Sequence, residues 1–247
     1  MGTPENVLKI CDSLRNLGYS DAGNKLCEAL MHSSDDPLAL VSLALNSVVT
    51  DEKNLKYEKC LRISKLGSPV FFSDLLNYKV RQLDLEYIQS LGSLNFVKNG
   101  ENLVIWGAPG TGKTWLGMAY ATKACQEGKR TRWVTYPFLC RELMRLKGED
   151  SKRLEARIRY YCAFDLLCID EFPNYDIEDK YLMQEFFNQA KLSGHSIIVC
   201  GQCCPENWDS LFEVKSFAQS IRGRLLEKSH RLELKGPDLR TYIPDKG

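Results

Sequence analysis

Short apolar runs alternate with longer amphipathic segments from residue 100 onward. Five runs have the length of strands, and the stretches between them have helical character. Strands that alternate with helices are typical of a parallel sheet covered on both faces. The pattern therefore predicts an α/β fold with a five-stranded parallel sheet, whose strands lie at residues 102–106, 131–135, 165–169, 196–200 and 231–234.

The first 66 residues follow a purely helical pattern. Apolar residues recur at helical spacing in the opening segment, and the segments at 20–33 and 36–66 continue the theme. Gly67, Ser68 and Pro69 then break the helix. The apolar face of the opening segment comprises Val7, Leu8, Cys11, Leu14 and Leu17.

These patterns divide the chain into three predicted parts. Residues 1–66 form a small helical domain for DNA or a protein partner, and 67–99 form a connection that contains a helix at 77–91. Residues 100–247 form the α/β domain, and no helical domain follows its fifth strand.

Composition and charge narrow the class of protein. The chain has 247 residues, 26% of them charged, and a formal net charge of +1, so a nucleic-acid surface must come from local clustering. We expect a cytoplasmic protein without a membrane anchor, because no signal-peptide pattern and no apolar run of about 20 residues is present. Ten cysteines fall mostly in apolar segments and suit buried, reduced thiols. The "CGQCC" cluster lacks the further ligands of a zinc site.

The sequence "GAPGTGKT" at 107–114 follows the first predicted strand and fits the phosphate-loop motif G-x-x-x-x-G-K-[ST]. Its glycines let the backbone amides surround phosphate oxygens, and the next helix directs its positive end at them. Lys113 is expected to reach the β and γ phosphates, and the Thr114 hydroxyl to ligate Mg²⁺. The expected ATP-binding residues are Gly107, Ala108, Pro109, Gly110, Thr111, Gly112, Lys113, Thr114 and Trp115.

A second motif, "DLLCIDE" at 165–171, is an apolar strand that ends in two carboxylates. Ligands bind at the carboxyl ends of strands in α/β sheets, so Asp170 is expected to hold the magnesium ion. Glu171 is expected to orient and activate a water molecule that attacks the γ phosphate. A water-activating glutamate favours an ATPase over a small-molecule kinase, which must exclude that water.

Two further polar groups are candidates for the same reaction. Gln202 follows the fourth predicted strand, and it would contact the γ phosphate if that strand lay between those carrying the phosphate loop and Asp170. Arg222 and Arg224 lie in a predicted helix, where residues two apart face differently, so one of them could act on a neighbouring subunit's ATP. The spacing alone does not choose between Arg222 and Arg224.

Residues 123–159 are strongly basic, with eleven Lys or Arg against five Asp or Glu. The pattern suggests two short helices joined by a loop. Such clustering suits contact with a nucleic-acid backbone, although a solvated helical face has the same composition. The candidate DNA-binding residues are Arg130, Arg132, Arg141, Arg145, Lys147, Lys152, Arg153, Arg157 and Arg159.

The segments "GENLVIWGAPGTGKTWL", "FDLLCIDE", "SIIVCGQCCPENW" and "IRGRLLEKSHRLELKGPDLR" together resemble the IstB-like branch of the AAA+ ATPases, which are helpers of insertion-sequence transposases. They are also similar to DnaC-type helicase loaders. The resemblance covers roughly residues 55–240. Gln202, Trp208 and Arg224 fall on characteristic positions, whereas Gly223 stands where Asp is usual and Pro237-Asp238 replaces Glu-Ser.

This resemblance implies an ATPase that is slow and stimulated by DNA or assembly. It implies self-assembly into a homo-oligomer on duplex DNA in the presence of ATP, and activation of a partner transposase. The resemblance also favours DNA contact over a merely solvated helical face as the interpretation of the basic segment at 123–159. The alternative is a loader of a replicative helicase that acts on single-stranded DNA. A metabolic P-loop kinase and an ATP-gated interaction protein without turnover are the remaining hypotheses.

Overall fold

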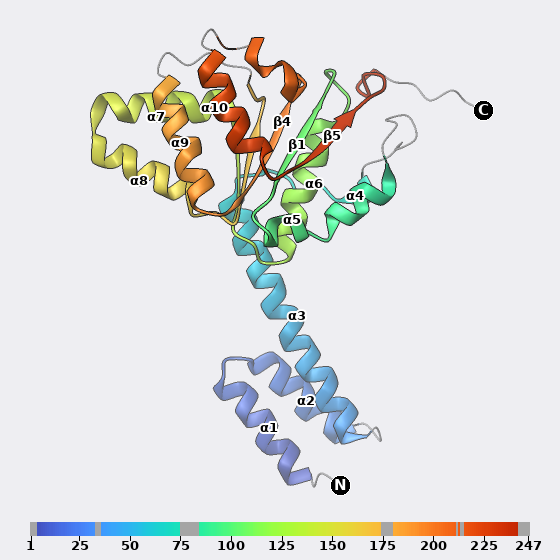
Figure 1. Cartoon of the computed structure of the whole chain (residues 1–247). Coiled ribbons are helices and arrows are strands. Elements are labelled where there is room, and N and C mark those ends of the chain that lie inside the picture. Colours follow the sequence, from blue (N-terminus) through green and yellow to red (C-terminus); the bar gives the residue numbers. More distant parts are fainter. Residues whose placement is uncertain are drawn as a thin grey trace, which may run out of the picture. The chain divides into compact units, whose positions relative to one another are not determined.

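A computed structural model describes residues 4–32, 36–74, 84–173, 180–210, 212 and 215–241. The chain divides into two compact units, residues 1–58 and 59–247 (Figure 1). The long helix α3, Pro37–Ser64, contributes to both units.

The N-terminal unit is helical, as the periodicity predicts. It contains α1 (Pro4–Asn16), α2 (Ser20–His32) and the first part of α3. These helices bury a small core of Cys11, Leu14, Ala22, Leu26, Ala44 and Val48. Two members of the predicted apolar face of the opening segment are not in that core: Leu8 of α1 is 45% exposed, and Leu17, which follows α1, is 72% exposed.

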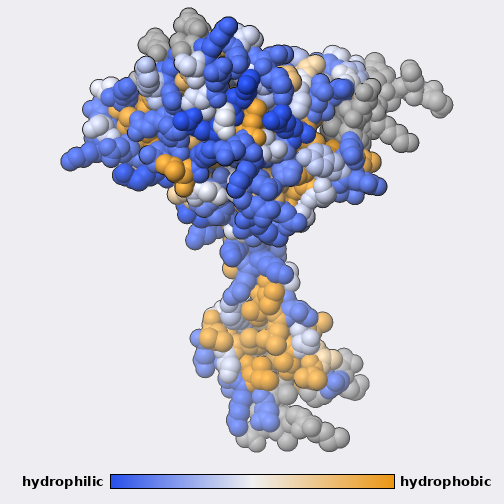
Figure 2. All heavy atoms as spheres, viewed as in Figure 1, coloured by the Kyte–Doolittle hydropathy of each residue, from blue (hydrophilic) through white to orange (hydrophobic). Residues whose placement is uncertain are grey.

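This unit also has apolar side chains on its surface. Among its described residues, eight large apolar side chains are exposed, and apolar residues gather on the face of the unit seen in Figure 2. Exposed apolar patches of this kind mark interaction sites more often than ordinary surface. The eight residues are Leu8, Leu17, Met31, Leu38, Leu43, Leu45, Val49 and Leu55.

The second unit is built on the predicted five-stranded parallel sheet. The strand order is β2-β3-β4-β1-β5, so the strand with the phosphate loop, β1, has β4 and β5 as its neighbours. Each predicted strand is present with shifts of no more than two residues at its ends. The strands are β1 (Asn102–Gly107), β2 (Thr131–Thr135), β3 (Leu166–Asp170), β4 (Ser196–Gly201) and β5 (Ser229–Leu234).

Helices cover both faces of this sheet (Figure 1). Seven α-helices and two short 3-10 turns of the described residues follow α3 along the chain. They are η1 (Phe72–Asp74), α4 (Leu85–Gly92), α5 (Asn95–Lys98), α6 (Lys113–Gln126), α7 (Tyr136–Glu149), α8 (Ser151–Cys162), α9 (Lys180–Leu192), η2 (Pro205–Ser210) and α10 (Lys215–Leu226).

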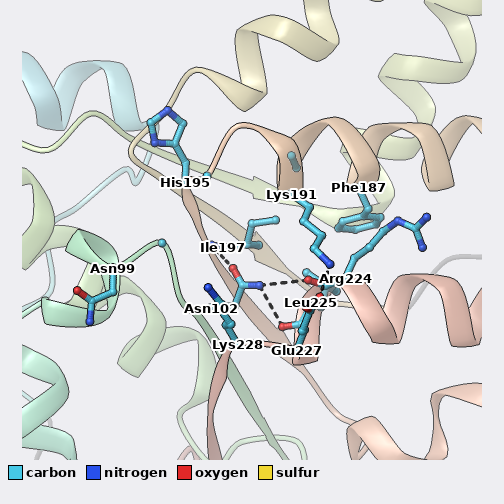
Figure 3. A pocket seen from close by; sticks show the side chains of 13 residues that line it. Asn99, Asn102, Phe187, Lys191, His195, Ile197, Arg224, Leu225, Glu227 and Lys228 are labelled. Atoms are coloured by element: carbon cyan, nitrogen blue, oxygen red, sulfur yellow. Dashed lines mark hydrogen bonds and ion pairs between the residues drawn. The ribbon is translucent and has the colours of Figure 1, made fainter.

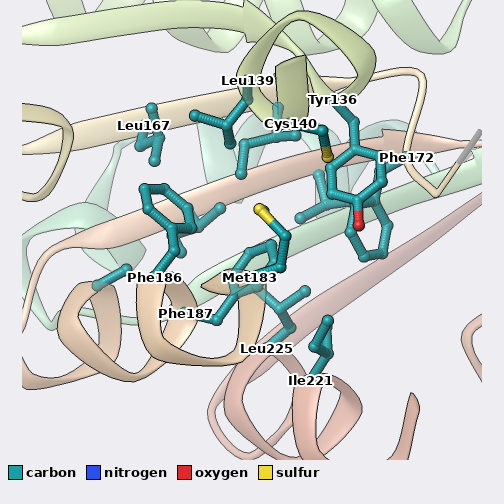
Figure 4. Packing of buried hydrophobic residues seen from close by; sticks show 14 of the residues in the cluster. Tyr136, Leu139, Cys140, Leu167, Phe172, Met183, Phe186, Phe187, Ile221 and Leu225 are labelled. Carbon is teal, nitrogen blue, oxygen red and sulfur yellow. The ribbon is translucent and has the colours of Figure 1, made fainter. Parts of the chain in front are cut away.

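Successive side chains of a strand point to opposite faces of the sheet because the strand is pleated. Val104, Leu167 and Val199 point into a large cluster with aromatic and aliphatic side chains of α7 to α10. Figure 4 shows Met183, Phe186 and Phe187 of α9 packed in this cluster against Leu139 and Ile221.

The other face of the sheet packs against α6. Gly117 of α6 lies close to the sheet, since a Cβ atom there would stand 2.7 Å from the Cys200 sulfur. Cys168 and Cys200 are fully buried, and desolvation raises the pKa of both thiols well above its ordinary value. Both therefore pack as small apolar groups, as the sequence predicts for most of its cysteines.

Two local boundaries have clear causes. Helix α4 begins at Leu85 because the Asp84 carboxylate accepts the Tyr87 N–H at 3.0 Å. The earlier part of the helix predicted at 77–91 lies outside the described residues. Asp150 separates α7 from α8 and caps α8 by accepting the Lys152 N–H at 2.9 Å. No helix among the described residues is long and apolar enough to cross a membrane.

Candidate nucleotide-binding site

The phosphate loop connects β1 to α6 at the carboxyl edge of the sheet. Gly110 and Gly112 adopt φ angles of 75° and 91°, which other residues rarely tolerate. The Thr111 hydroxyl donates to the Ala108 carbonyl at 2.8 Å and closes the turn. The loop therefore has the local conformation that its glycines predict, with the amino end of α6 directly behind it.

Lys113 begins α6 and is only 9% exposed. Its ammonium group donates to the Ala108 carbonyl at 2.7 Å. Burial lowers the pKa of Lys113 from its ordinary value, while the nearby Asp170 carboxylate opposes this effect. A cation that has lost much of its hydration interacts strongly with a phosphate oxygen that reaches it.

Asp170 lies at the carboxyl end of β3 and is 8% exposed. The Thr114 hydroxyl donates to its Oδ2 at 3.0 Å, so the two predicted metal ligands meet although 56 positions separate them. Burial raises the pKa of Asp170 above its ordinary value, against the hydrogen bonds that it accepts from Glu171 and Thr114. A hydroxyl and a buried carboxylate side by side are the oxygen donors that suit Mg²⁺.

Glu171 is exposed beside this pair, and its φ of 58° is uncommon for a residue other than glycine. Its N–H donates to Asp170 Oδ1 at 2.9 Å. The next residue, Phe172, donates its N–H to the Cys200 carbonyl at 2.9 Å. Gly201 permits this approach, because a Cβ atom there would stand 1.9 Å from the Phe172 oxygen. The backbone thus turns sharply and holds Glu171 at the edge of the site.

One pocket joins these groups. Strand β4 lies between β3, which carries Asp170, and β1, which carries the phosphate loop. Gln202 follows β4 and lines the pocket, as a contact with the γ phosphate requires. Trp115 is not among the lining residues and is 54% exposed. Six lining residues were not predicted from the sequence: Phe172, Pro173, Cys200, Gly201, Cys203 and Arg240. The lining residues are Pro109, Gly110, Lys113, Thr114, Asp170, Glu171, Phe172, Pro173, Cys200, Gly201, Gln202, Cys203 and Arg240.

Arg224 lies at the opposite edge of the sheet. It lines a cavity with Asn102, which begins β1, and with Lys228, which precedes β5 (Figure 3). Its guanidinium hydrogen-bonds the Asn188 side chain and donates to the Ser220 carbonyl at 2.6 Å. The phosphate loop follows the other end of β1, which Asn102 begins. Arg222 pairs with Asp209 at 3.3 Å.

The basic segment, residues 123–159, runs from the last turn of α6 through β2 and α7 into α8, and its residues differ in their surroundings. Arg132 is half-buried, lies over the rings of Tyr160 and Tyr161, and donates to the Ile63 carbonyl at 3.2 Å. Arg130 lies over the Phe164 ring. Four arginines form ion pairs with acidic residues of the two helices or with the acidic residue between them: Arg145 with Glu149, Arg153 with Asp150, Arg157 with Glu142 and Arg159 with Glu155. Arg141, Lys147 and Lys152 are exposed on the same helices.

The parallel sheet, the phosphate loop and the adjoining carboxylates define an ATP-binding protein of the P-loop AAA+ class. Residues 18–243 match the family model of the IstB-like ATP binding proteins. The chain belongs to this family. It is 26% identical over 240 residues to an insertion-sequence ATP-binding protein of Sinorhizobium fredii, a match that covers 95% of this chain and 94% of the relative.

Solved structures share the fold at low identity. DnaA of Aquifex aeolicus bound to AMPPCP superposes with a TM-score of 0.57 and 18% identity, over 72% of this chain and 54% of that one. The DnaC helicase loader superposes with a TM-score of 0.51 and 16% identity, over 72% of this chain and 99% of that one. These likenesses support the AAA+ architecture.

Proposed function

We propose that this protein hydrolyses ATP with Mg²⁺, and that its ATP-bound form assembles on duplex DNA and activates a partner transposase. The observation that carries the catalytic part is the 3.0 Å hydrogen bond between Thr114 and Asp170, with Glu171 beside it. Family membership supports the link to insertion sequences, because the relatives that the chain matches are insertion-sequence ATP-binding proteins.

The residues divide the chemistry among them. Lys113 and the loop amides bind the phosphates, and Thr114 and Asp170 would hold Mg²⁺. The metal ion, when bound, neutralises charge on the β and γ phosphates. Glu171 orients a water molecule and accepts its proton, and Gln202 contacts the γ phosphate from the end of β4. Water reaches Glu171 readily, since this side chain is exposed.

A second subunit completes the site in this proposal. Arg224 is separated from its own phosphate loop by the length of the strands, so it can serve only the ATP of a neighbour. A cation supplied across an interface makes hydrolysis depend on assembly. Its present partners, Asn188 and Ser220, would have to release the guanidinium as the subunits meet.

The DNA and protein surfaces are assigned to different parts of the chain. We assign the α7–α8 basic surface to the phosphate backbone of duplex DNA, with Arg141, Lys147 and Lys152 as its principal contacts. Arg132 is given a packing role, because its guanidinium lies against two tyrosine rings. The apolar N-terminal unit is assigned to the partner transposase, since its exposed aliphatic side chains suit a protein surface.

A helicase loader that acts on single-stranded DNA is the second candidate. The similarity to the DnaC helicase loader favours it at the level of fold. The insertion-sequence relatives match nearly the whole chain and favour the first candidate.

The first test of the proposed activity compares ATP hydrolysis by the unmodified protein and by Glu171→Gln. We expect the variant to retain ATP binding and to lose hydrolysis by at least about 100-fold, the scale of a lost general base. Hydrolysis at the unmodified rate would remove Glu171 from its role. Absence of hydrolysis in the unmodified protein, with and without duplex DNA, would refute the ATPase assignment.

A further inference from the structure

The segment that follows β5 returns to the phosphate loop. The Leu239 N–H donates to the Gly110 carbonyl at 3.0 Å. Asp238 lies directly on the loop, because a Cβ atom on Gly110 would stand 1.9 Å from its Oδ1. This segment therefore forms one wall of the nucleotide pocket rather than a separate surface.

Arg240 projects from the same segment into the lining of that pocket, together with Lys113 and Asp170. Asp238 holds its guanidinium through two hydrogen bonds, from Nη2 at 2.5 Å and from Nε at 2.9 Å. The Asp238 carboxylate also accepts the Arg240 N–H at 3.0 Å. The side chain of Arg240 is 70% exposed and that of Asp238 is 32% exposed, so both can exchange partners without unfolding the loop.

The Lys113 ammonium and the Arg240 guanidinium both line the pocket at the phosphate loop, and the Asp238 carboxylate pairs with Arg240 there. Arg240 and Lys113 line the same pocket, so a phosphate group held there lies within the reach of both cations. Arginine binds phosphate oxygens in the same two-pronged geometry that it uses here with a carboxylate. The hydrogen bonds from Arg240 lower the pKa of Asp238 to about 2, so Asp238 is charged at neutral pH.

We propose that Arg240 is a second phosphate-binding cation of the nucleotide site, and that Asp238 weakens ATP binding by competing with the phosphates for its guanidinium. The proposal rests on the nucleotide site described above and is independent of the proposed DNA and transposase roles. ATP displaces the Asp238 carboxylate from the Arg240 guanidinium. The contacts of the segment from Lys235 to Thr241 therefore depend on whether phosphates occupy the loop. ADP, which has one charge fewer, displaces it less effectively.

A double-mutant cycle on ATP affinity tests this competition. We expect Arg240→Gln to weaken ATP binding about tenfold, the scale of a charge-assisted hydrogen bond. Asp238→Asn keeps the side-chain oxygen that accepts the Arg240 N–H but removes the charge, and it should tighten ATP binding by about fivefold. In the Arg240→Gln background, Asp238→Asn should change the affinity little, because the group for which it competes is absent.

Three controls separate this role from simple folding of the segment. Lys235→Gln lies in the same segment, in an exposed pair with Glu233, and should leave ATP affinity unchanged. Arg240→Lys keeps the charge without the paired geometry and should fall between Arg240→Gln and the unmodified protein. Lys113→Ala should abolish ATP binding, so binding that survives this change would locate the nucleotide elsewhere and refute the site itself, not only the role of Arg240.

Two results would overturn the proposal. The first is unchanged ATP affinity in Arg240→Gln while Lys113→Ala abolishes binding. The second is a weakening by Asp238→Asn that is equal with and without Arg240, which would mean that Asp238 only holds the segment on the loop.

Discussion

The Thr114 hydroxyl donates a hydrogen bond to Oδ2 of Asp170, with 3.0 Å between the two oxygens. Thr114 lies in the first turn of α6 and Asp170 ends β3, so the bond joins the two motifs of the nucleotide site. The Asp170 carboxylate in this pair is largely buried, because the residue is only 8% exposed.

Burial of this charged group predicts that Asp170→Asn stabilises the fold. Burial raises the pKa of Asp170, so ionisation of the folded protein above that pKa is unfavourable relative to the unfolded chain. Asparagine keeps an oxygen for Thr114 and removes the charge. At pH 7 without nucleotide, we expect thermal unfolding to occur a few degrees higher, a gain of about 1 kcal/mol.

The pH dependence identifies the cause of that gain. The penalty in the unmodified protein fades as pH falls through the raised pKa, and it is gone below the ordinary value of 3.8. The advantage of Asp170→Asn should therefore vanish near that pH. A lower unfolding temperature for the variant at pH 7 would show that the carboxylate stabilises the site instead.

The position of Arg224 predicts complementation between defective subunits. Lys113→Ala removes ATP binding but leaves Arg224 intact, whereas Arg224→Ala binds ATP but offers no arginine to its neighbour. We expect each variant alone to retain less than about 1% of the hydrolysis rate, given the 10³-fold or larger effect of such arginines. Equal mixtures on duplex DNA should recover a substantial part of it.

Arg222→Ala is the matched control, because Arg222 lies on the same helix and pairs with Asp209. It should hydrolyse ATP at nearly the unmodified rate. An inactive mixture, under conditions where the unmodified protein assembles, would argue against a role for Arg224 across the interface.

The α7–α8 surface predicts a salt-dependent affinity for DNA. Replacing Arg141, Lys147 and Lys152 by alanine should weaken duplex binding and flatten the plot of log K against log salt by about 0.9 per lost phosphate contact. Fluorescence anisotropy at several salt concentrations measures both quantities. Lys98→Ala with Lys235→Ala removes charge elsewhere on the second unit, and an equal loss in that control would mean that only net charge matters.

The elements that the sequence predicts well are those with local causes. Each strand is a short apolar run, and the phosphate loop is a contiguous motif, so periodicity and glycine spacing suffice to place them. The order of the strands is not local, yet Gln202 becomes part of the site only because β4 lies between β3 and β1.

Long-range packing explains what the sequence could not provide. In the sequence, Arg132 belongs to the same basic segment as the other candidate DNA-binding residues. In the folded protein its guanidinium lies over the rings of Tyr160 and Tyr161. Asp238 was visible as a departure from the usual family pattern, while its contact with Gly110 depends on the path of the chain after β5. No spacing rule connects residues 110 and 240.

Binding to duplex and single-stranded DNA of equal length, with and without a non-hydrolysable ATP analogue, tests the central claim most directly. We predict tight duplex binding that requires the analogue, that persists with ATP in Glu171→Gln, and that is lost in Lys113→Ala. Preference for single strands would contradict this account and favour the helicase-loader function. Binding to neither DNA would exclude ATP-dependent assembly on DNA as the activity of this protein.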